Sequence, residues 1–265
     1  MQNKVVLTLE EKEIIEKLKK DPYYIKSLTN VTEDMALAVV KNNGVLIRYV
    51  ENPSENVMWE ALKQNPWAIE YIHNPNEDMC LYVVEKAWNS LRYIKDQSYN
   101  VIKKAIESKG WAIQFALNPD IELQKIAVEK DFDSIKFIKN PSCEIQMVAV
   151  KKDWSSIKFI DNPCDEAELE SIRSNEEAMR YLHITDEKIN KYIKVNVKVA
   201  KYLKEEKLKE LEPIIIEEIG KEEADNQFLL DFIECDAFKF DKVRFIYKYG
   251  SMKAKTVLLD YKLGM

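Results

Sequence analysis

The chain has 265 residues, of which 46% are hydrophobic and 32% are charged, with a formal net charge of −6. The apolar content is sufficient for a buried core, whereas a total of five glycines argues against glycine-rich phosphate loops and turn-rich β folds. The mildly acidic balance argues against nonspecific nucleic-acid binding as the main activity, although it is compatible with a local basic surface.

The chain carries no sequence signal for membrane insertion or secretion. No segment reaches the ~18 consecutive apolar residues of a membrane span, and the N-terminal sequence MQNKVVLTLEEKEIIEKLKK lacks the apolar core of a signal peptide. The abundance of Lys, Asn, Ile and Glu suits a low-GC bacterium or its phage. We therefore expect a soluble protein in the cytoplasm of a bacterium, or of a phage-infected bacterial cell, with no membrane partner.

Residues 1–29 are expected to contain an N-terminal capping helix and a first half-repeat. Thr8 and Glu11 have the spacing of a capping box, in which each side chain accepts a hydrogen bond from the backbone N–H of the other residue. A helix is therefore predicted to begin after Thr8.

A repeat with a period of 22 residues follows from residue 30 onward, and its most visible feature is Asn followed by Pro. The anchor asparagines are Asn52, Asn74, Asn118, Asn140 and Asn162, and steps of 22 residues also reach Asn30 and Asp96. A fixed period over such a length is the sequence signature of a solenoid, in which each repeat packs against its neighbours.

Each repeat is expected to hold two short helices. After Asn74, for example, Met79, Val83 and Val84 form an apolar stripe with helical spacing, which predicts a first helix of about eleven residues. After a break, the motif Leu-Arg-Tyr-Ile (91–94) marks a second segment of about seven residues. A short helix or 3₁₀ turn is favoured for this segment, and a strand is the alternative because the i, i+2 spacing also fits.

The Asn-Pro motif is interpreted as the start of the first helix of each repeat. Asn is a favoured N-cap because its side-chain oxygen accepts hydrogen bonds from free N–H groups of the first turn, and Pro fits the first helical position. An acidic residue three positions after the Asn would complete a capping box. It occurs at Glu33, Glu55 and Glu77, with Asp165 as a shorter version. The motif is therefore expected to be structural rather than catalytic.

With these features the repeats resemble the two-helix repeats of the leucine-rich variant family, in which Asn-Pro or His-Pro also starts a helix at near-regular spacing. They are equally similar to Asn-Pro-containing helical repeats in bacterial and phage proteins of unknown function. The resemblance covers about 30–183 and implies a two-helix solenoid, whereas neither group provides a catalytic motif. The cysteine cluster that binds an iron–sulfur centre in some leucine-rich variant proteins has no counterpart in this sequence.

The periodicity ends in the C-terminal part of the chain. The motif Ala200-Lys-Tyr-Leu203 lies one residue early, as expected of a degenerate last repeat. Residues 207–223 form a charged amphipathic segment that Pro213 is expected to interrupt. The motif KVRFIYKYG (242–250) is compatible with either a helix or a strand.

Together these patterns predict an all-α fold. An α-solenoid of about eight two-helix repeats is expected over 30–206. It follows the capping helix and half-repeat of 1–29 and precedes a mostly helical C-terminal cap, or a small appended domain, in 207–265.

The cysteines and histidines do not form a recognisable site. The cysteines are Cys80, Cys143, Cys164 and Cys235. None forms a CxxC pair, so reduced and mostly buried thiols are expected. Cys143 and Cys164 lie in neighbouring repeats and could approach each other, but with no nearby His or further Cys no zinc site is predicted. His73 and His183 are five repeats apart and are expected to be separate surface residues.

The tryptophans are expected to be structural. Trp67, Trp88, Trp111 and Trp154 lie near the junction of the two helices of their repeats. We expect them to close the edge of the solenoid rather than to form a stacking site for a ligand. No nucleophile–base pair, EF-hand, P-loop or HExxH motif occurs in the sequence. We therefore predict no enzymatic activity, cofactor or metal.

The candidate binding residues are basic. The position after the Ile column is basic in six of eight repeats, at Lys26, Arg48, Arg92, Lys136, Lys158 and Arg180, and is occupied by Glu70 and Gln114 in the other two. Stacked repeats would align these six residues, which we call the basic ladder. Such a ladder can meet an acidic protein surface or a phosphate backbone. The alternative is a solvated face without a partner, because long basic side chains also cover apolar surface.

Two functional hypotheses follow. The first is a non-enzymatic scaffold that binds another protein, most readily one with an acidic patch. A concrete form of it is a phage or accessory inhibitor that binds a host protein through an extended solenoid face. The second is nucleic-acid or nucleotide binding through the basic ladder, assisted by the basic segment 241–265.

Overall fold

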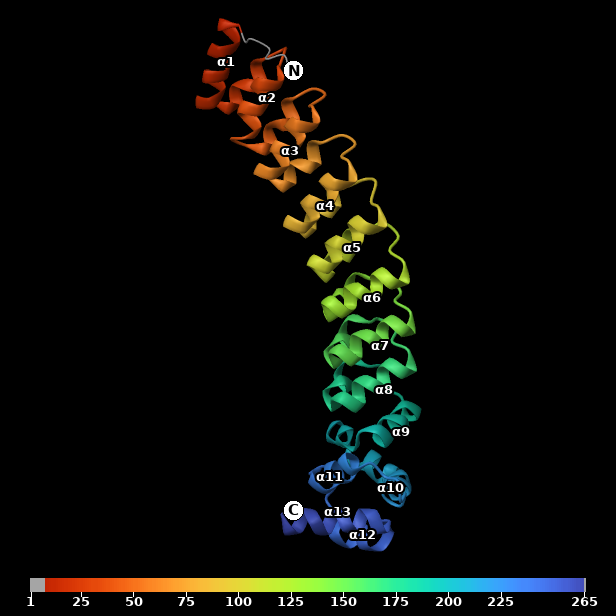
Figure 1. Cartoon of the computed structure of the whole chain (residues 1–265). Helices are drawn as coiled ribbons and strands as arrows, with labels where there is room; N and C mark the ends of the chain where they lie inside the picture. The colour runs from red at the N-terminus through yellow and green to blue at the C-terminus, as the bar shows by residue number, and fades with distance from the viewer. Residues whose placement is uncertain (1–7, 265) are drawn as a thin grey trace. The chain divides into compact units, whose positions relative to one another are not determined.

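The fold is all-α, as predicted. The computed structural model describes residues 8–264, which contain thirteen α-helices and nine 3₁₀ helices and no strand (Figure 1). Each repeat consists of an α-helix followed by a six-residue 3₁₀ helix, here labelled η. The chain divides into two compact units, one ending at Ile138 and one beginning at Lys139.

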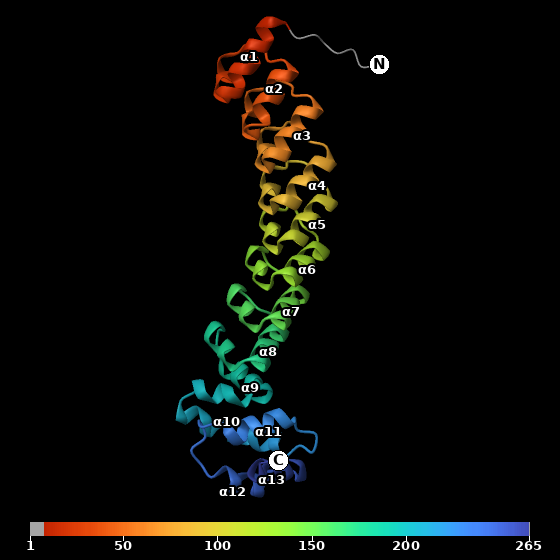
Figure 2. The same cartoon turned by 60° about the vertical axis from the view of Figure 1, so that its left-hand side comes forward.

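The first unit contains six repeats. Its α-helices are α1 (Leu9–Lys20), α2 (Glu33–Val40), α3 (Glu55–Gln64), α4 (Glu77–Lys86), α5 (Tyr99–Ser108) and α6 (Ile121–Lys130). Its 3₁₀ helices are η1 (Pro22–Ser27), η2 (Gly44–Tyr49), η3 (Pro66–Tyr71), η4 (Trp88–Tyr93), η5 (Gly110–Phe115) and η6 (Phe132–Phe137). Within this unit each α-helix contacts the next α-helix and each η helix contacts the next η helix, so the unit has two layers (Figure 2).

The second unit contains three repeats and four further helices. The repeats are α7 (Cys143–Lys152), η7 (Trp154–Phe159), α8 (Asp165–Ser174), η8 (Glu176–Tyr181), α9 (Asp186–Val195) and η9 (Val197–Tyr202). The further helices are α10 (Glu205–Ile219), α11 (Asn226–Glu234), α12 (Lys242–Tyr249) and α13 (Met252–Leu263). Residues 242–249 are therefore helical, which excludes the strand alternative. The predicted interruption at Pro213 is wrong, because α10 continues through it.

The second segment of each repeat is a short 3₁₀ helix, and in η3 hydrogen bonds cap it at both ends. In η3 the Asn65 side chain accepts a hydrogen bond from Trp67 N at 3.0 Å, and Ile72 N donates to Ile69 O at 3.2 Å. The helix buries Ala68 and Ile69 against the core and leaves Glu70 exposed. At three residues per turn, side chains three positions apart, such as the buried Ile69 and Ile72, lie on the same side of the segment.

The predicted N-cap role of the anchor asparagines is wrong. Asn52, Asn74, Asn118 and Asn140 have positive φ angles of 46° to 53°. The α-helices instead begin two residues later, after an N-cap that lies beyond the proline. These N-caps include Ser54, Asn76, Ser98, Asp120 and Ser142, and each side chain accepts a hydrogen bond from the first turn. Asn suits the anchor because it tolerates the left-handed region better than most residues do.

The acidic residues assigned to a capping box also have a different role. Glu33, Glu55 and Glu77 are the first residues of their helices, and each accepts a hydrogen bond from the N-cap side chain of the next repeat. The distances are 2.7 Å from Ser54 Oγ, 3.0 Å from Asn76 Nδ2 and 2.5 Å from Ser98 Oγ. We call this contact the N-terminal joint, because it connects the N-termini of consecutive α-helices.

Candidate interaction surface

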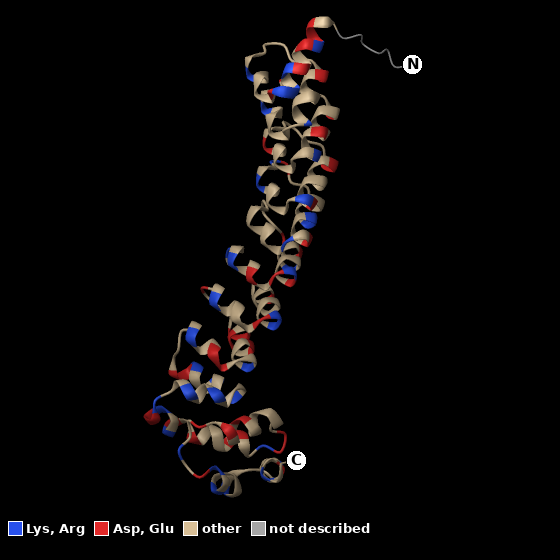
Figure 3. Ribbon diagram, turned by 90° about the vertical axis from the view of Figure 1, so that its left-hand side faces the viewer, with Lys and Arg blue, Asp and Glu red and all other residues tan. Residues whose placement is uncertain are grey.

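All six residues of the basic ladder are exposed. Each is the fifth residue of an η helix, directly after a buried residue such as Ile47 or Ile135. The buried neighbour fixes the backbone while the basic side chain extends into solvent. Figure 3 shows basic segments recurring along the η helices within each unit. Glu70 and Gln114 occupy the same exposed position.

The structure adds one ladder residue that the periodicity missed. Lys201 is the fifth residue of η9, but it follows Arg180 by 21 residues, one fewer than the period of 22. The early motif Ala200-Lys-Tyr-Leu203 was the available sequence signal, because moving it by one residue places Lys201 in the basic column. Its ammonium group lies 3.1 Å from Glu176 Oε1, and hydrogen bonding to this carboxylate raises the pKa of Lys201.

Aromatic rings lie beneath the basic groups in the first unit. Lys26 Nζ is 5.3 Å from the ring centroid of Tyr49, and the Arg48 guanidinium carbon is 4.8 Å and 5.8 Å from those of Tyr49 and Tyr71. The Arg92 guanidinium lies 4.1 Å from the centroid of Phe115. These contacts connect one repeat with the next through cation–π interactions.

In the first unit, Lys136 contacts both an aromatic ring and a carboxylate group. Its ammonium group lies 4.0 Å from the ring centroid of Trp111 and 2.8 Å from Asp133 Oδ2. Trp111 Nε1 donates to the other carboxylate oxygen of Asp133 at 2.7 Å. Burial opposes the ionised form of Asp133, but the hydrogen bonds from Lys136 and Trp111 outweigh it and lower the pKa of this carboxyl group.

The second unit also places ladder cations next to aromatic rings, within one repeat at Lys158 and between repeats at Arg180. Lys158 Nζ lies 4.8 Å from the ring centroid of Phe159, and the Arg180 guanidinium carbon lies 5.6 Å from that of Tyr202. In both units, therefore, the ladder presents cations together with aromatic rings. Such a surface can bind carboxylates or phosphates and can also pack against flat groups.

A surface hollow adjoins the ladder in the first unit. It has a volume of about 580 Å³ and is lined by Arg48, Asn52, Tyr71, His73 and Asn74, among others. It lies where η2 and η3 lead into the Asn-Pro linkers. The ladder is therefore not a uniform ridge, because this hollow lies beside Arg48.

The predictions for tryptophan and histidine hold in part. Trp88 packs against Phe115, and Trp111 packs edge-on against Phe137. These two rings pack between neighbouring repeats, in keeping with a structural role, whereas Trp67 is 51% exposed. His73 and His183 are both exposed, as expected, and belong to different units.

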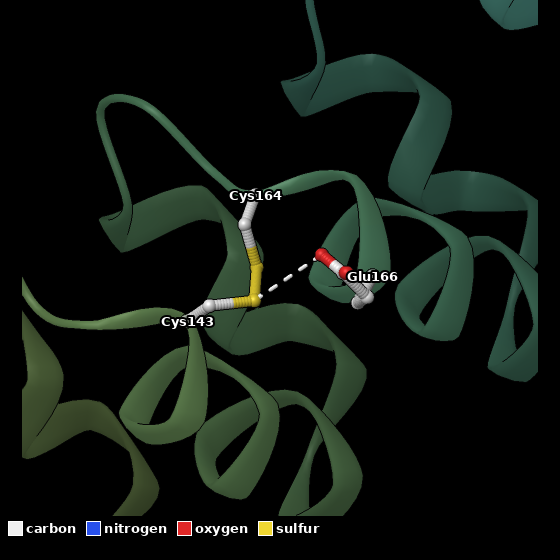
Figure 4. A group of neighbouring side chains, drawn as sticks. All are labelled: Cys143, Cys164 and Glu166. Carbon is white, nitrogen blue, oxygen red and sulfur yellow. Dashed lines mark hydrogen bonds between the residues drawn. A yellow bond between two sulfur atoms is a disulfide. The ribbon is translucent and has the colours of Figure 1, made fainter.

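The prediction of reduced cysteines is wrong for one pair. Cys143 and Cys164 form a disulfide, and Cys143 Sγ lies 3.3 Å from Glu166 Oε2 (Figure 4). Cys80 and Cys235 are free and buried, as expected. Burial raises the pKa of the Cys80 thiol to about 11. The repeat spacing brought Cys143 and Cys164 into neighbouring repeats, but it did not reveal that both lie at helix N-termini.

Comparison with known proteins found no match to this chain among protein-family models, curated proteins or solved structures. Across residues 8–264, the helices are all too short or too polar to cross a membrane.

Proposed function

We propose that this protein is a non-enzymatic scaffold that binds another protein, with an acidic surface, through the basic ladder. The observation that carries the proposal is the recurrence of an exposed cation next to an aromatic ring at the same position of six repeats. A solenoid adds one such position with each repeat and needs no deeper core to do so. A phage or accessory inhibitor of a host protein remains the concrete form of the proposal.

The aromatic contacts favour binding in two ways. They restrict the long side chains of Arg48 and Arg92 without neutralising their charge, which lowers the entropy lost when a partner binds. They also provide apolar area beside each charge, as in the centres of protein interfaces, where Arg and Tyr are enriched. Charge complementarity with an acidic partner would increase the association rate.

The test begins with capture of partners from a lysate of the source organism on the immobilised chain. We expect one protein in stoichiometric amount. The charge reversals Lys26→Glu, Arg48→Glu and Arg92→Glu, combined in one variant, should then weaken its binding at least tenfold, mainly through a slower association rate.

A matched control carries the same charge change elsewhere. Lys63, Lys86 and Lys130 lie in the last turns of α3, α4 and α6, within the same unit. Their combined change to Glu should leave the affinity within about threefold, because rim charges outside the interface contribute little. Equal losses in both variants would contradict a role of the ladder.

Nucleic-acid binding is the second candidate, favoured by the pairing of cations with aromatic rings. Single-stranded nucleic acids bind to surfaces that combine phosphate contacts with base stacking. A single-stranded oligonucleotide should then bind with steep salt dependence. If this binding were lost in a variant that combines Lys136→Glu, Lys158→Glu and Arg180→Glu, nucleic-acid binding would be the better explanation of the ladder, and the protein-partner proposal would be wrong.

A further inference from the structure

The disulfide occupies a position that a hydrogen bond fills in other repeats. Cys143 is the first residue of α7 and Cys164 is the N-cap of α8, with a sequence separation of 21. Glu77 and Ser98 stand in the same relation at the start of α4 and α5. The disulfide is therefore a covalent version of the N-terminal joint, at a place where the fold elsewhere needs only a hydrogen bond.

The two repeats remain connected at this place without the disulfide. Gln146 is 5% exposed, and its side chain donates to Pro141 O at 2.9 Å and accepts from Cys164 N at 2.7 Å. This buried amide holds the backbone at Cys164 against α7. Opening the disulfide would thus leave the two sulfur atoms close together, ready to bond again.

The two sulfur atoms have different surroundings. Cys164 makes no capping hydrogen bond in the disulfide form. Once released, its thiolate can take the N-cap role at the positive end of α8, as Ser98 Oγ does for Val101 N. Cys143 Sγ lies 3.3 Å from the carboxylate of Glu166, which opposes a negative charge on that sulfur and can accept a hydrogen bond from its thiol. The same carboxylate lies within 4.8 Å of Cys164 Sγ. The difference between the two sulfur atoms therefore rests on the direct Glu166 contact at Cys143 and on the N-cap position of Cys164.

The other charged groups near the disulfide are carboxylates in the first turns of α7 and α8, and two of them are paired with lysines. Asp165 is 3.1 Å from Lys191, and the buried Glu168 is 2.6 Å from Lys188. Glu144 follows Cys143 in the first turn of α7. Both cysteines are partly exposed, so an external thiol can approach them.

We propose that Cys143 and Cys164 form a reversible redox-modification site whose substrate is an external dithiol. A thiolate of the dithiol attacks Cys143 Sγ, the Cys143–Cys164 bond breaks, and Cys164 leaves as the thiolate. The second thiol of the reagent then displaces Cys143, which takes up a proton and donates it in a hydrogen bond to Glu166. In total, two electrons and one proton pass to the protein, the second proton of the dithiol goes to solvent, and the dithiol becomes a disulfide. An external disulfide reverses the reaction: Cys143 first forms a mixed disulfide with it and releases one thiol of the reagent, and the Cys164 thiolate then attacks Cys143 Sγ and displaces the other.

The first test uses the oxidised full chain and dithiothreitol without denaturant. Thiols are labelled with a maleimide after increasing times and assigned by peptide mass spectrometry, while circular dichroism follows the helix content. We expect Cys143 and Cys164 to become labelled while Cys80 and Cys235 stay unlabelled and the helix content is unchanged. Labelling of all four cysteines in parallel would overturn the proposal, because reduction would then require unfolding.

The second test separates a reactive pair from a merely structural one. Cys143→Ser leaves the Cys164 thiol, and Cys164→Ser leaves the Cys143 thiol. Serine is the N-cap in several repeats, which suits Cys164→Ser, and Cys143→Ser changes a partly exposed first residue of α7 while its N-cap Ser142 stays in place, so both variants should fold. At neutral pH, iodoacetamide should alkylate Cys164 at least tenfold faster than Cys143. In Glu166→Gln combined with Cys164→Ser, alkylation of Cys143 should accelerate severalfold. Equal rates in the two single variants, or no effect of Glu166→Gln, would overturn the assignment of Cys164 as the leaving thiolate.

Discussion

Three serines occupy a buried position that alanine fills in other repeats. Ser90, Ser134 and Ser156 are 0% exposed, and their hydroxyl groups have no hydrogen-bond partner among the described residues. Ala68 and Ala112 stand at the same place in η3 and η5. A buried hydroxyl without a partner loses its hydration and gains nothing in return.

Ser134→Ala should therefore stabilise the protein. We expect the free energy of unfolding to rise by about 1 kcal/mol, the typical cost of an unsatisfied buried polar group. Urea denaturation followed by circular dichroism measures this change. Ser142→Ala is the control, since it removes an N-cap and should destabilise by about 1 kcal/mol. A loss of stability in Ser134→Ala would show that its hydroxyl is satisfied in solution.

The positive φ of Asn118 leads to a second residue-scale prediction. Its φ of 50° favours Asn or Gly and disfavours other residues by about 1–2 kcal/mol. Asn118→Gly should leave the unfolding free energy within about 0.5 kcal/mol, whereas Asn118→Ser should lower it by about 1 kcal/mol. Denaturant titration of both variants separates a positive-φ role of Asn118 from an N-cap role. If Asn118 were an N-cap, Asn118→Ser would keep the stability of the natural chain, because Ser is an equally good N-cap.

The sequence contained the correct cap, but the Asn-Pro motif concealed it. Asn is favoured both as an N-cap and at positive φ, so its residue type alone could not separate the two roles. The distinguishing signal was the column two residues later, which holds Ser54, Ser98 and Asp120. A serine or aspartate at this position is a good N-cap for the apolar stripe that follows. With the N-cap there, the proline of the Asn-Pro motif lies before the helix and not inside it.

At the scale of the elements, the two-helix repeat could be predicted because its apolar columns recur with a constant period. Whether the second helix was α or 3₁₀ could not be predicted, because a six-residue segment contains too few apolar positions to separate spacings of 3.0 and 3.6 residues. The N-terminal joint was also hidden. It connects Glu77 with Ser98, which are 21 residues apart, and only the stacking of α4 on α5 brings them together.

The N-terminal joint between α4 and α5 can be measured by a double-mutant cycle. Ser98→Ala should cost about 1 kcal/mol because it removes both the N-cap and the joint. Glu77→Ala should cost less, and the two changes together should cost about 0.5 kcal/mol less than their sum. The α5–α6 step serves as control, since Tyr99 begins α5 and has no carboxylate to bind Asp120. There, Tyr99→Ala and Asp120→Ala should be additive in urea titrations.

In the whole molecule, the net charge is negative although one surface column is mostly basic. The net charge is −6, yet the ladder position is basic in most repeats of both units. The period predicted which basic residues share a column. It could not predict their stacking on aromatic rings such as Tyr49 and Phe115, because that depends on how closely consecutive η helices pack.

Two lysines at the ladder position form ion pairs that contribute to the folding stability of the chain. Lys136 binds Asp133, and Lys201 binds Glu176. Burial opposes ionisation of Glu176, but hydrogen bonds from its own backbone amide and from Lys201 outweigh it and place the pKa below the ordinary value of 4.5. The pKa of Asp133 is likewise lowered from its ordinary value of 3.8.

Acidification should therefore destabilise the protein. A carboxyl group with a lowered pKa in the folded state contributes stability that is complete at neutral pH and is lost as the pH falls through that pKa. We expect the free energy of unfolding to be nearly constant around neutral pH and to decrease as the pH falls below 4.5, the ordinary value for Glu176. Asp133→Asn combined with Glu176→Gln should be less stable at pH 7 but should lose less stability between pH 5 and pH 3, in urea titrations at constant ionic strength. If the variant and the natural chain showed equal slopes over this range, repulsion among the positive charges of the acidified chain would be the cause instead.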